Sequence, residues 1–195
     1  MMRLINYSGL VFMFLLIPLS SSAQDKLEKE KRLKETDFPA IALKTLRTHL
    51  PELRKQKYYL ETDGERESFE TKFRFSKRKY SIEFDDKGQL EDIEIDYYFR
   101  KIASNAKDKI AAYLNSEYDK WKVEKLQLQY LPIESLKKTF RDALALKVQA
   151  ASNYEIVILT RKKGEIKKYE FLFDIEGNFI KKRRVLRRDY GFLLF

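Results

Sequence analysis

The side chains able to do chemistry in this chain are carboxylates, basic residues and one histidine, because the sequence contains no cysteine. Thiol catalysis, thiolate metal sites and disulfides are therefore excluded. His49 is the single histidine, and one histidine without cysteine does not supply the ligands of a zinc site. Ser76 and Ser81 have no histidine near them in the sequence, so we expect no activated serine nucleophile.

Three acidic residues share one face of an expected strand, at Asp92, Glu94 and Asp96. Such spacing suggests calcium, but calcium sites usually draw their ligands from a loop. Basic residues are expected on the same face of the neighbouring strands, so we interpret the acidic row as one side of cross-strand charge pairs. The basic partners in this interpretation are Lys72, Arg74 and Lys79.

No enzyme class is marked by a motif. The six glycines are spread over 195 residues and form no phosphate-binding loop. A pair of catalytic carboxylates can be chosen from the 30 acidic residues, but no spacing singles one out. We therefore expect a protein that is not an enzyme, with no catalytic residue, metal or cofactor, and keep an unmarked carboxylate hydrolase as an alternative.

The strongest feature outside the expected core is a basic run near the C-terminus. The net charge is +10, and residues 98–195 hold 22 Lys/Arg against 12 Asp/Glu. Basic side chains on an edge strand protect it from aggregation. They also suit an acidic protein, an acidic polysaccharide or an anionic lipid surface. The basic residues of this run are Lys181, Lys182, Arg183, Arg184, Arg187 and Arg188.

The elements that position these residues contain a repeat. Residues 79–90 and 168–179 share the pattern Lys-Tyr-x-apolar-x-Phe-Asp-x-x-Gly-x-apolar at an offset of 89. The alternation of large apolar residues predicts a strand, and Asp-x-x-Gly predicts the turn of a hairpin. We therefore expect two copies of one helix-on-sheet unit in an α+β fold.

The first unit, residues 38–98, is expected to hold one helix that starts at Phe38-Pro39 and about four antiparallel strands. The second unit, residues 99–186, repeats this plan, with its helix aligned to the first at an offset of 67 and an extra helix inserted at 132–151. A rival alignment pairs Phe38-Pro39 with Leu131-Pro132. The expected strands are 57–61, 69–75, 79–84 and 91–97, then 121–130, 154–160, 166–174 and 179–186.

The second unit differs from the first in having apolar residues on both faces of its sheet. Val157 and Leu159, with Leu172 on the neighbouring strand, face away from the expected core. A sheet that is apolar on both faces must be covered on both. We expect the inserted helix and the apolar tail from Phe192 to Phe195 to cover this patch, and an exposed patch for a protein partner is the alternative.

The N-terminus predicts export. Arg3, the apolar run Leu10 to Leu19 and the small residues before Ala23 form a signal peptide, with cleavage expected after Ala23. The run is too short to span a bilayer, so we expect no transmembrane segment in the mature chain. Export makes nucleic acid an unsuitable partner, and the charged leader at 24–37 is expected to be helical or frayed.

A cleavable leader followed by two helix-and-hairpin units with Tyr-x-apolar-x-Phe-Asp-x-x-Gly resembles the PepSY-like proteins of bacterial envelopes. These share a fold with the beta-lactamase inhibitor protein, and the resemblance covers residues 38–186. The segments Ile110 to Leu114 and Trp121 to Leu126 also resemble this family. The resemblance implies two tandem repeats with a joint surface that binds or inhibits other proteins, and it implies no catalytic residue.

Our expectation is a non-enzymatic, exported binding or inhibitor module, periplasmic or secreted, that contacts a protein or another acidic partner through its second repeat. The first alternative is attachment to anionic lipid or polysaccharide through the basic run at 181–188. The binding residues expected are Val157, Leu159, Leu172 and the six basic residues of that run.

Overall fold

The structure is a computed structural model that describes residues 25–26, 28–53 and 55–186. The expected signal peptide, its cleavage site and the tail at 187–195 lie outside the described residues, as do Arg187 and Arg188. No helix within the described ranges is both long and apolar enough to cross a membrane.

The described residues form one continuous sheet of ten strands in the order β1-β10-β9-β8-β7-β6-β5-β4-β3-β2. The pairing of β1 with β10 is parallel, and every other neighbouring pair is antiparallel. The strands are β1 (Asp25–Lys26), β2 (Glu28–Leu33), β3 (Lys57–Asp63), β4 (Arg66–Phe75), β5 (Arg78–Phe84), β6 (Leu90–Asp96), β7 (Lys120–Tyr130), β8 (Asn153–Lys162), β9 (Glu165–Asp174) and β10 (Phe179–Val185).

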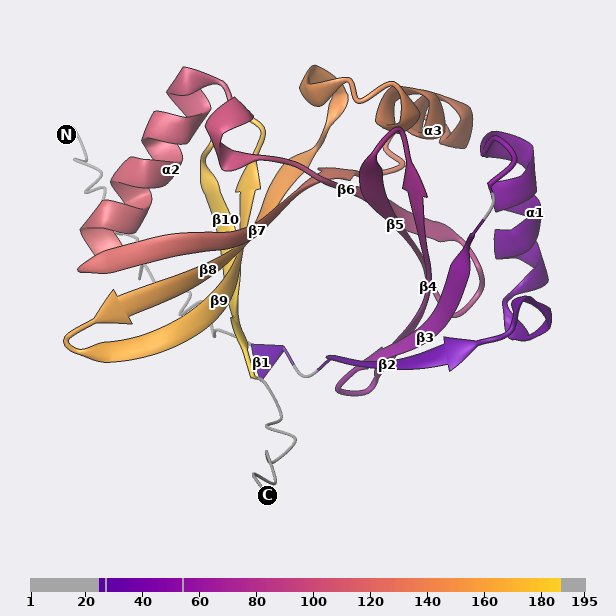
Figure 1. Ribbon diagram of the computed structural model, residues 1–195, viewed down its shortest axis with the longest axis horizontal. Coiled ribbons are helices and arrows are strands. Elements are labelled where there is room, and N and C mark those ends of the chain that lie inside the picture. The colour runs from indigo at the N-terminus through magenta and orange to yellow at the C-terminus, as the bar shows by residue number, and fades with distance from the viewer. Residues whose placement is uncertain (1–24, 27, 54, 187–195) are drawn as a thin grey trace, which may run out of the picture.

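The sheet curves until its two edges approach each other. β1 and β2 follow one another in the chain, yet β1 pairs with β10 at one edge and β2 with β3 at the other. Figure 1 shows the strands curving around an open centre, with β1 and β2 joining the two ends of the curve. The edges that a flat sheet would expose are therefore brought together by the N-terminal segment.

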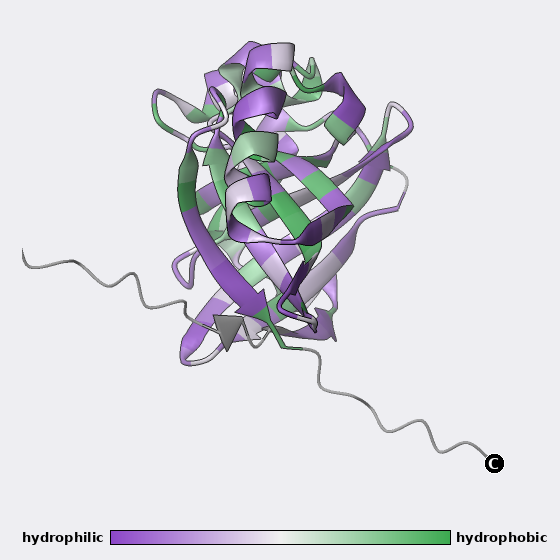
Figure 2. Ribbon diagram, turned by 90° about the vertical axis from the view of Figure 1, so that its left-hand side faces the viewer, coloured by the Kyte–Doolittle hydropathy of each residue, from purple (hydrophilic) through white to green (hydrophobic). Residues whose placement is uncertain are grey.

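Within the described ranges, three helices lie on the outside of the curved sheet (Figure 1) and cover its apolar face: α1 (Ala40–His49), α2 (Ser104–Glu117) and α3 (Leu136–Leu144). Short 3₁₀ turns occur at Glu35–Asp37, Phe99–Lys101 and Val148–Ala150. Figure 2 shows hydrophobic and hydrophilic bands alternating along the strands, as the period of two requires. The core therefore lies between the helices and the convex face, and the polar side chains point inward.

The two Asp-x-x-Gly turns have the same geometry. Asp85 and Asp174 each accept the backbone N–H of the glycine three positions later, at 2.9 and 3.0 Å. Gly88 has φ +77° and lies against Ala42 of α1, while Gly177 has φ +85° and lies against Ala106 of α2. Ala42 and Ala106 are therefore the equivalent positions of α1 and α2, and they are 64 residues apart in the sequence rather than the predicted 67.

The α+β class is confirmed, but the sheet is one continuous structure rather than two separate ones. The charged leader is also different from the prediction, because β2 is a strand that pairs along its whole length with β3. Backbone pairing at the sheet edge decides its conformation, although its sequence Glu-Lys-Glu-Lys-Arg-Leu has no apolar alternation.

The inserted helix is α3, which is shorter than the predicted 132–151. Its residues Phe140 and Ala143 are buried in the same core as the sheet, and it packs beside α1 and β6. Ser135 caps it through an Oγ that accepts the N–H of Lys138. The expected cover for Val157 and Leu159 is therefore wrong as far as this helix is concerned, because α3 lies on the opposite, convex face.

Candidate functional site

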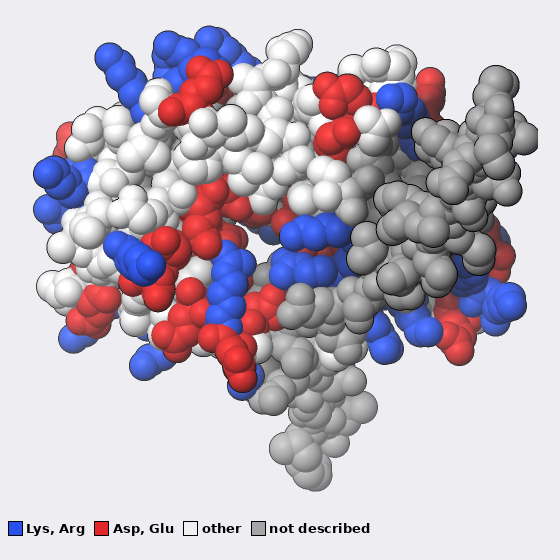
Figure 3. All heavy atoms as spheres, turned by 180° about the vertical axis from the view of Figure 1, so that it is seen from behind, with Lys and Arg blue, Asp and Glu red and all other residues white. Residues whose placement is uncertain are grey.

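The inner face of the curved sheet surrounds a polar cavity of about 410 Å³, which we call the lumen. The described residues place ten carboxylates and five Lys or Arg side chains in its wall. Figure 3 shows a hollow in the surface with acidic and basic side chains around it. The charged residues of the wall are Glu30, Glu61, Asp63, Glu70, Glu83, Glu91, Asp92, Glu94, Glu155, Glu170, Arg66, Lys72, Lys125, Lys181 and Arg183.

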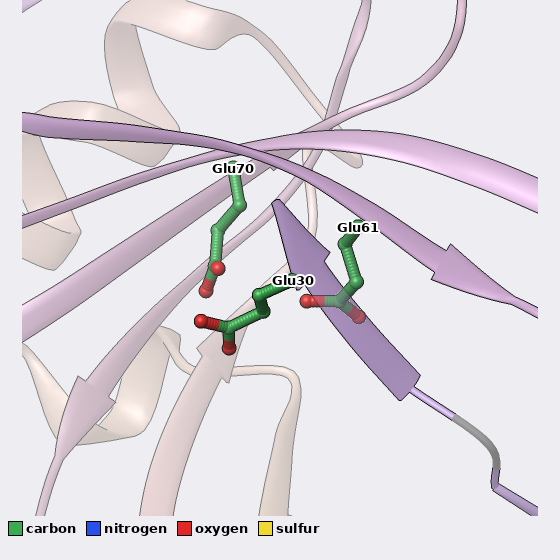
Figure 4. A group of neighbouring side chains, drawn as sticks. All are labelled: Glu30, Glu61 and Glu70. Carbon is green, nitrogen blue, oxygen red and sulfur yellow. The ribbon is translucent and has the colours of Figure 1, made fainter. Parts of the chain in front are cut away.

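The first group of carboxylates in the lumen, the Glu30 cluster, comprises Glu30, Glu61 and Glu70 from β2, β3 and β4. Each offers an oxygen within 4.8 Å of the others, and Figure 4 shows the three side chains converging. The Nζ of Lys72 lies 2.6 Å from Glu30 Oε1 and 2.7 Å from Glu70 Oε2. Burial lowers the pKa of Lys72, but Glu70 and Glu30 raise it by more. The cluster thus holds an ammonium group from its own chain.

The second group, the Asp92 cluster, comprises Glu83 of β5 with Asp92 and Glu94 of β6. Glu83 and Asp92 are paired directly across the two strands, and the three side chains each offer an oxygen within 4.8 Å of the others. Asp92 and Glu94 are 8% and 6% exposed. Among the described residues, no Lys or Arg lies within 4.0 Å of these three carboxylates.

The electrostatics of the Asp92 cluster favour a neutralising partner. Burial, with a further contribution from Glu155, raises the pKa of Asp92 to about 7. Burial and the neighbouring carboxylates also hold the pKa values of Glu83 and Glu94 well above their usual range. Carboxylates in this arrangement are stable only when they share protons or bind a cation.

A chain of amides fixes the orientation of Asp92. Gln129 donates from Nε2 to Asp92 Oδ2 at 2.8 Å, and Asn153 donates from Nδ2 to Gln129 Oε1 at 2.8 Å. Asn153 is itself buried. The other oxygen, Asp92 Oδ1, is buried without a hydrogen-bond partner among the described residues.

The basic run is divided between the two faces of β10. Lys181 and Arg183 line the lumen, whereas Lys182 donates to the hydroxyl of Tyr118 on the helix-covered side. Arg184 is exposed. The strand therefore does not present its described basic residues as one continuous surface.

Arg183 is part of an ion-pair network that crosses between the sheet edges. It donates to Glu170 on β9 at 2.7 Å and to Asp63 at the end of β3 at 2.9 Å. Since β10 and β3 lie near opposite edges of the sheet, this contact joins them across the lumen.

The structure brings several of the predicted binding residues together. Val157 and Leu172 line the lumen beside Lys181 and Arg183, and Leu159, which does not line the lumen, is half-buried further along β8. The predicted charge pairing of Asp92 and Glu94 is wrong, because Lys72 instead pairs with Glu30 and Glu70.

Residues that the sequence interpretation missed include the Glu30 cluster, Glu83 and Gln129. The alternation of β5 already placed Glu83 on the face opposite the apolar residues Ile82 and Phe84. The signal that was lacking is the curvature of the sheet, which turns that face into the wall of a cavity.

Comparisons with known proteins support the fold. No family model and no curated protein matches the sequence. A DUF2874 family protein from Bacteroides ovatus is similar in structure, with a TM-score of 0.53 and 14% identity over 79% of this chain and 94% of that one. A Bacteroides eggerthii protein, provisionally described as periplasmic, gives a TM-score of 0.51 and 13% identity over 75% and 88%.

A BLIP-like protein from Bacteroides fragilis has a TM-score of 0.49 and 16% identity, over 80% of this chain and 94% of that one. The PepSY-like part of the resemblance described above is not shown by these neighbours. At identities of this size the likeness concerns the fold alone.

Proposed function

We propose that this chain is a non-enzymatic binding module of the bacterial envelope, and that its binding site is the lumen. The observation that carries the proposal is the excess of carboxylates over Lys and Arg in the lumen wall. Such a wall attracts a positively charged polar group and repels an acidic one. The cavity volume of about 410 Å³ lies within the range of small-ligand sites. The group that enters is then a basic side chain or terminus of a partner protein.

The proposal keeps part of the binding surface expected from the sequence. Val157 and Leu172 supply apolar wall area that suits the methylene stem of a Lys or Arg side chain. Arg183 and Lys181 remain lumen residues, but the carboxylates of the first half provide the main attraction. Export, supported by the signal-peptide pattern, places the partner in the envelope or outside the cell.

The test uses two fluorescent peptides, one of six lysines and one of six glutamates, with binding followed by anisotropy. We expect the lysine peptide to bind in low salt and to weaken as salt is added. The lumen variant Glu155→Gln should weaken it several-fold, because the residue is part of the lumen wall. Arg184→Gln is the matched control, since it changes one charge on an exposed side chain.

Binding of the acidic peptide instead of the basic one would contradict the proposal. Binding of the glutamate peptide that is lost with Arg184→Gln would overturn the lumen proposal and favour an acidic partner on the outer basic residues. A third arm uses vesicles with and without anionic lipid. Salt-sensitive sedimentation with the anionic vesicles alone would favour the lipid alternative.

A carboxylate hydrolase is the second candidate, favoured by the raised pKa of Asp92 inside a cavity. Acid and base roles require two carboxylates whose pKa values are pushed apart. In the Asp92 cluster the pKa values of all three carboxylates are pushed upward. This arrangement suits proton or cation binding better than hydrolysis, and turnover of glycoside or ester substrates that is lost in Asp92→Asn would reverse that ranking.

The tandem duplication is also a proposal, with repeats at 38–98 and 99–186. Its support is the shared geometry of the turns at Gly88 and Gly177 and their equivalent contacts with Ala42 and Ala106. The repeats would contribute adjoining halves of one curved sheet, and the lumen would be their joint surface.

A further inference from the structure

The two carboxylate clusters of the lumen differ in one respect that matters for ligand binding. Each brings three acidic oxygens within 4.8 Å of one another. The Glu30 cluster contains the ammonium of Lys72, at 2.6 and 2.7 Å from two of its members. The Asp92 cluster contains no equivalent Lys or Arg within 4.0 Å, as judged over the described residues. The same protein therefore neutralises one cluster internally and leaves the other to an outside group.

Strand pairing makes the repulsion in the Asp92 cluster unavoidable. Glu83 and Asp92 are directly opposite each other on β5 and β6, and Glu94 follows two positions later on the same face. Like charges directly opposite on neighbouring strands destabilise a sheet. The backbone register that places Ile82 and Ile93 in the core fixes this arrangement, so the side chains cannot separate by a register shift.

Asp92 gives a second, independent indication of a ligand. Asp92 is 8% exposed, and in the part of the chain that the structure describes its Oδ1 is buried without a hydrogen-bond partner. Oδ2 is held by Gln129, which Asn153 holds in turn. Outer hydrogen bonds that orient one carboxylate oxygen and leave the other free are typical of metal ligands.

We propose that Glu83, Asp92 and Glu94 form a calcium-binding site in the wall of the lumen. Each of the three carboxylates supplies an oxygen, and the lumen admits water to complete the six to eight oxygen ligands that Ca²⁺ takes. The inference does not depend on the proposed function, because a cation at this site is bound by β5 and β6 whether or not a partner enters the lumen.

The donor set selects among metals. It holds only carboxylate oxygens, which suit Ca²⁺, Mg²⁺ and Mn²⁺ and do not suit metals that prefer nitrogen or sulfur. Mg²⁺ requires near-ideal octahedral geometry at short distances, which three side chains on two adjacent pleated strands do not readily provide. Calcium tolerates mono- and bidentate carboxylates in irregular geometry, so it is the better fit.

The surroundings of the site affect its affinity in both directions. The described residues place two positive charges near the cluster. Lys125 of β7 partly offsets the rise in the pKa of Glu94, and Arg66 of β4, which donates a hydrogen bond to Glu91, partly offsets the rise in the pKa of Asp92. These charges oppose cation binding. The acidic groups around the cluster favour cation binding, and they are Glu91 on β6 itself with Glu61, Glu70 and Glu155 on other strands.

The test is a calorimetric titration of the chelator-treated protein with CaCl₂ at pH 8, where protons compete little. We expect one Ca²⁺ per chain with a dissociation constant on the order of 10⁻⁴ to 10⁻³ M, as in extracellular calcium modules. MgCl₂ should bind at least tenfold more weakly. Thermal unfolding followed in parallel should show a higher midpoint with Ca²⁺.

Variants locate the cation. Glu83→Gln and Asp92→Asn should abolish the titration heat and the calcium-dependent thermal shift. Without calcium they should unfold at a higher temperature than the wild type, since each removes repulsion. Glu30→Gln is the matched control, because it removes one carboxylate from the cluster that Lys72 already neutralises, and it should keep calcium binding.

Three results would overturn the proposal. One is the absence of both heat and thermal shift in the wild type at 10 mM Ca²⁺. Another is unchanged binding in Glu83→Gln or Asp92→Asn, and the third is binding of Mg²⁺ as tight as that of Ca²⁺. Should a variant fail to fold, Glu94→Gln is the replacement.

Discussion

At the scale of single residues, the raised pKa of Asp92 predicts how the free energy of unfolding changes with pH. Its pKa in the folded protein is about 7, against an ordinary value of 3.8. The folded state therefore binds the proton more tightly than the unfolded state between these values. The resulting stabilisation is complete below about pH 4 and is lost as the pH rises through about 7. In chelator, urea unfolding at a series of pH values should show a loss on the order of 4 kcal/mol.

Asp92→Asn should reduce this dependence, because the amide does not ionise, while the raised pKa values of Glu83 and Glu94 keep the remainder. Asp142 on α3 is the matched control with the opposite sign: hydrogen bonds from Lys147 and Arg141 lower the pKa of its carboxyl group. Asp142→Asn should therefore lower stability at neutral pH and leave the decline between pH 4 and 8 in place. A wild-type stability that rises over this range would contradict the assignment of Asp92.

At the scale of elements, the docking of each turn on its helix depends on a glycine. A Cβ at Gly177 would lie 2.3 Å from the carbonyl oxygen of Ala106, and the φ of +85° is itself unfavourable for alanine. Gly177→Ala should therefore lower the free energy of unfolding by about 2–5 kcal/mol, because the left-handed backbone strain and the overpacking add together. The free energy of unfolding in urea measures it.

Gly164 provides the control, because it has the same φ of +85° but no atom of the described residues lies within 4 Å of an added Cβ. Gly164→Ala should cost only the strain of about 1–2 kcal/mol. Gly88→Ala should lie between the two, since its added Cβ would meet Ala42, Ile41 and Pro39 at 3.2 Å. Equal costs at Gly177 and Gly164 would show that the contact with α2 contributes nothing.

The same elements show which parts of the fold were accessible from sequence. Strands β4, β5 and β6 were predicted within a few residues, because apolar and charged side chains alternate strictly along them. β2 was missed because its strand conformation comes from pairing with β3 and not from its own sequence. The boundaries of the two repeats stay a prediction.

At the scale of the whole molecule, the candidate site arises from curvature, which no local pattern records. Glu61 lies on β3 and Glu155 on β8, with four strands between them in the sheet, and yet both side chains line the lumen. The alternation of side chains along each strand places these two residues on its polar face. The curvature of the sheet and the contacts between its edges make those faces one wall, and no local sequence pattern predicts either of them.

The closing of the curve is also supported by the ion pair between Arg183 and Asp63, two residues 120 positions apart in the chain. Both side chains are about four-fifths buried, at 23% and 21% exposed. A double-mutant cycle with Arg183→Ala and Asp63→Ala should therefore give a coupling energy on the order of 1 kcal/mol or more. Arg183→Ala alone should cost more than Asp63→Ala, because Arg183 also bonds Glu170.

A distance measurement separates closure from ordinary stability. Spin labels at the exposed positions Lys31 on β2 and Arg184 on β10 report the separation of the two edges. We expect a narrow distance distribution in the wild type and a broader one in Arg183→Ala, because the contact across the lumen is lost. An unchanged distribution together with zero coupling would mean that β1 and β2 hold the edges without the ion pair. The lumen would then owe its shape to the backbone alone, and Arg183 would serve only to neutralise Glu170 and Asp63.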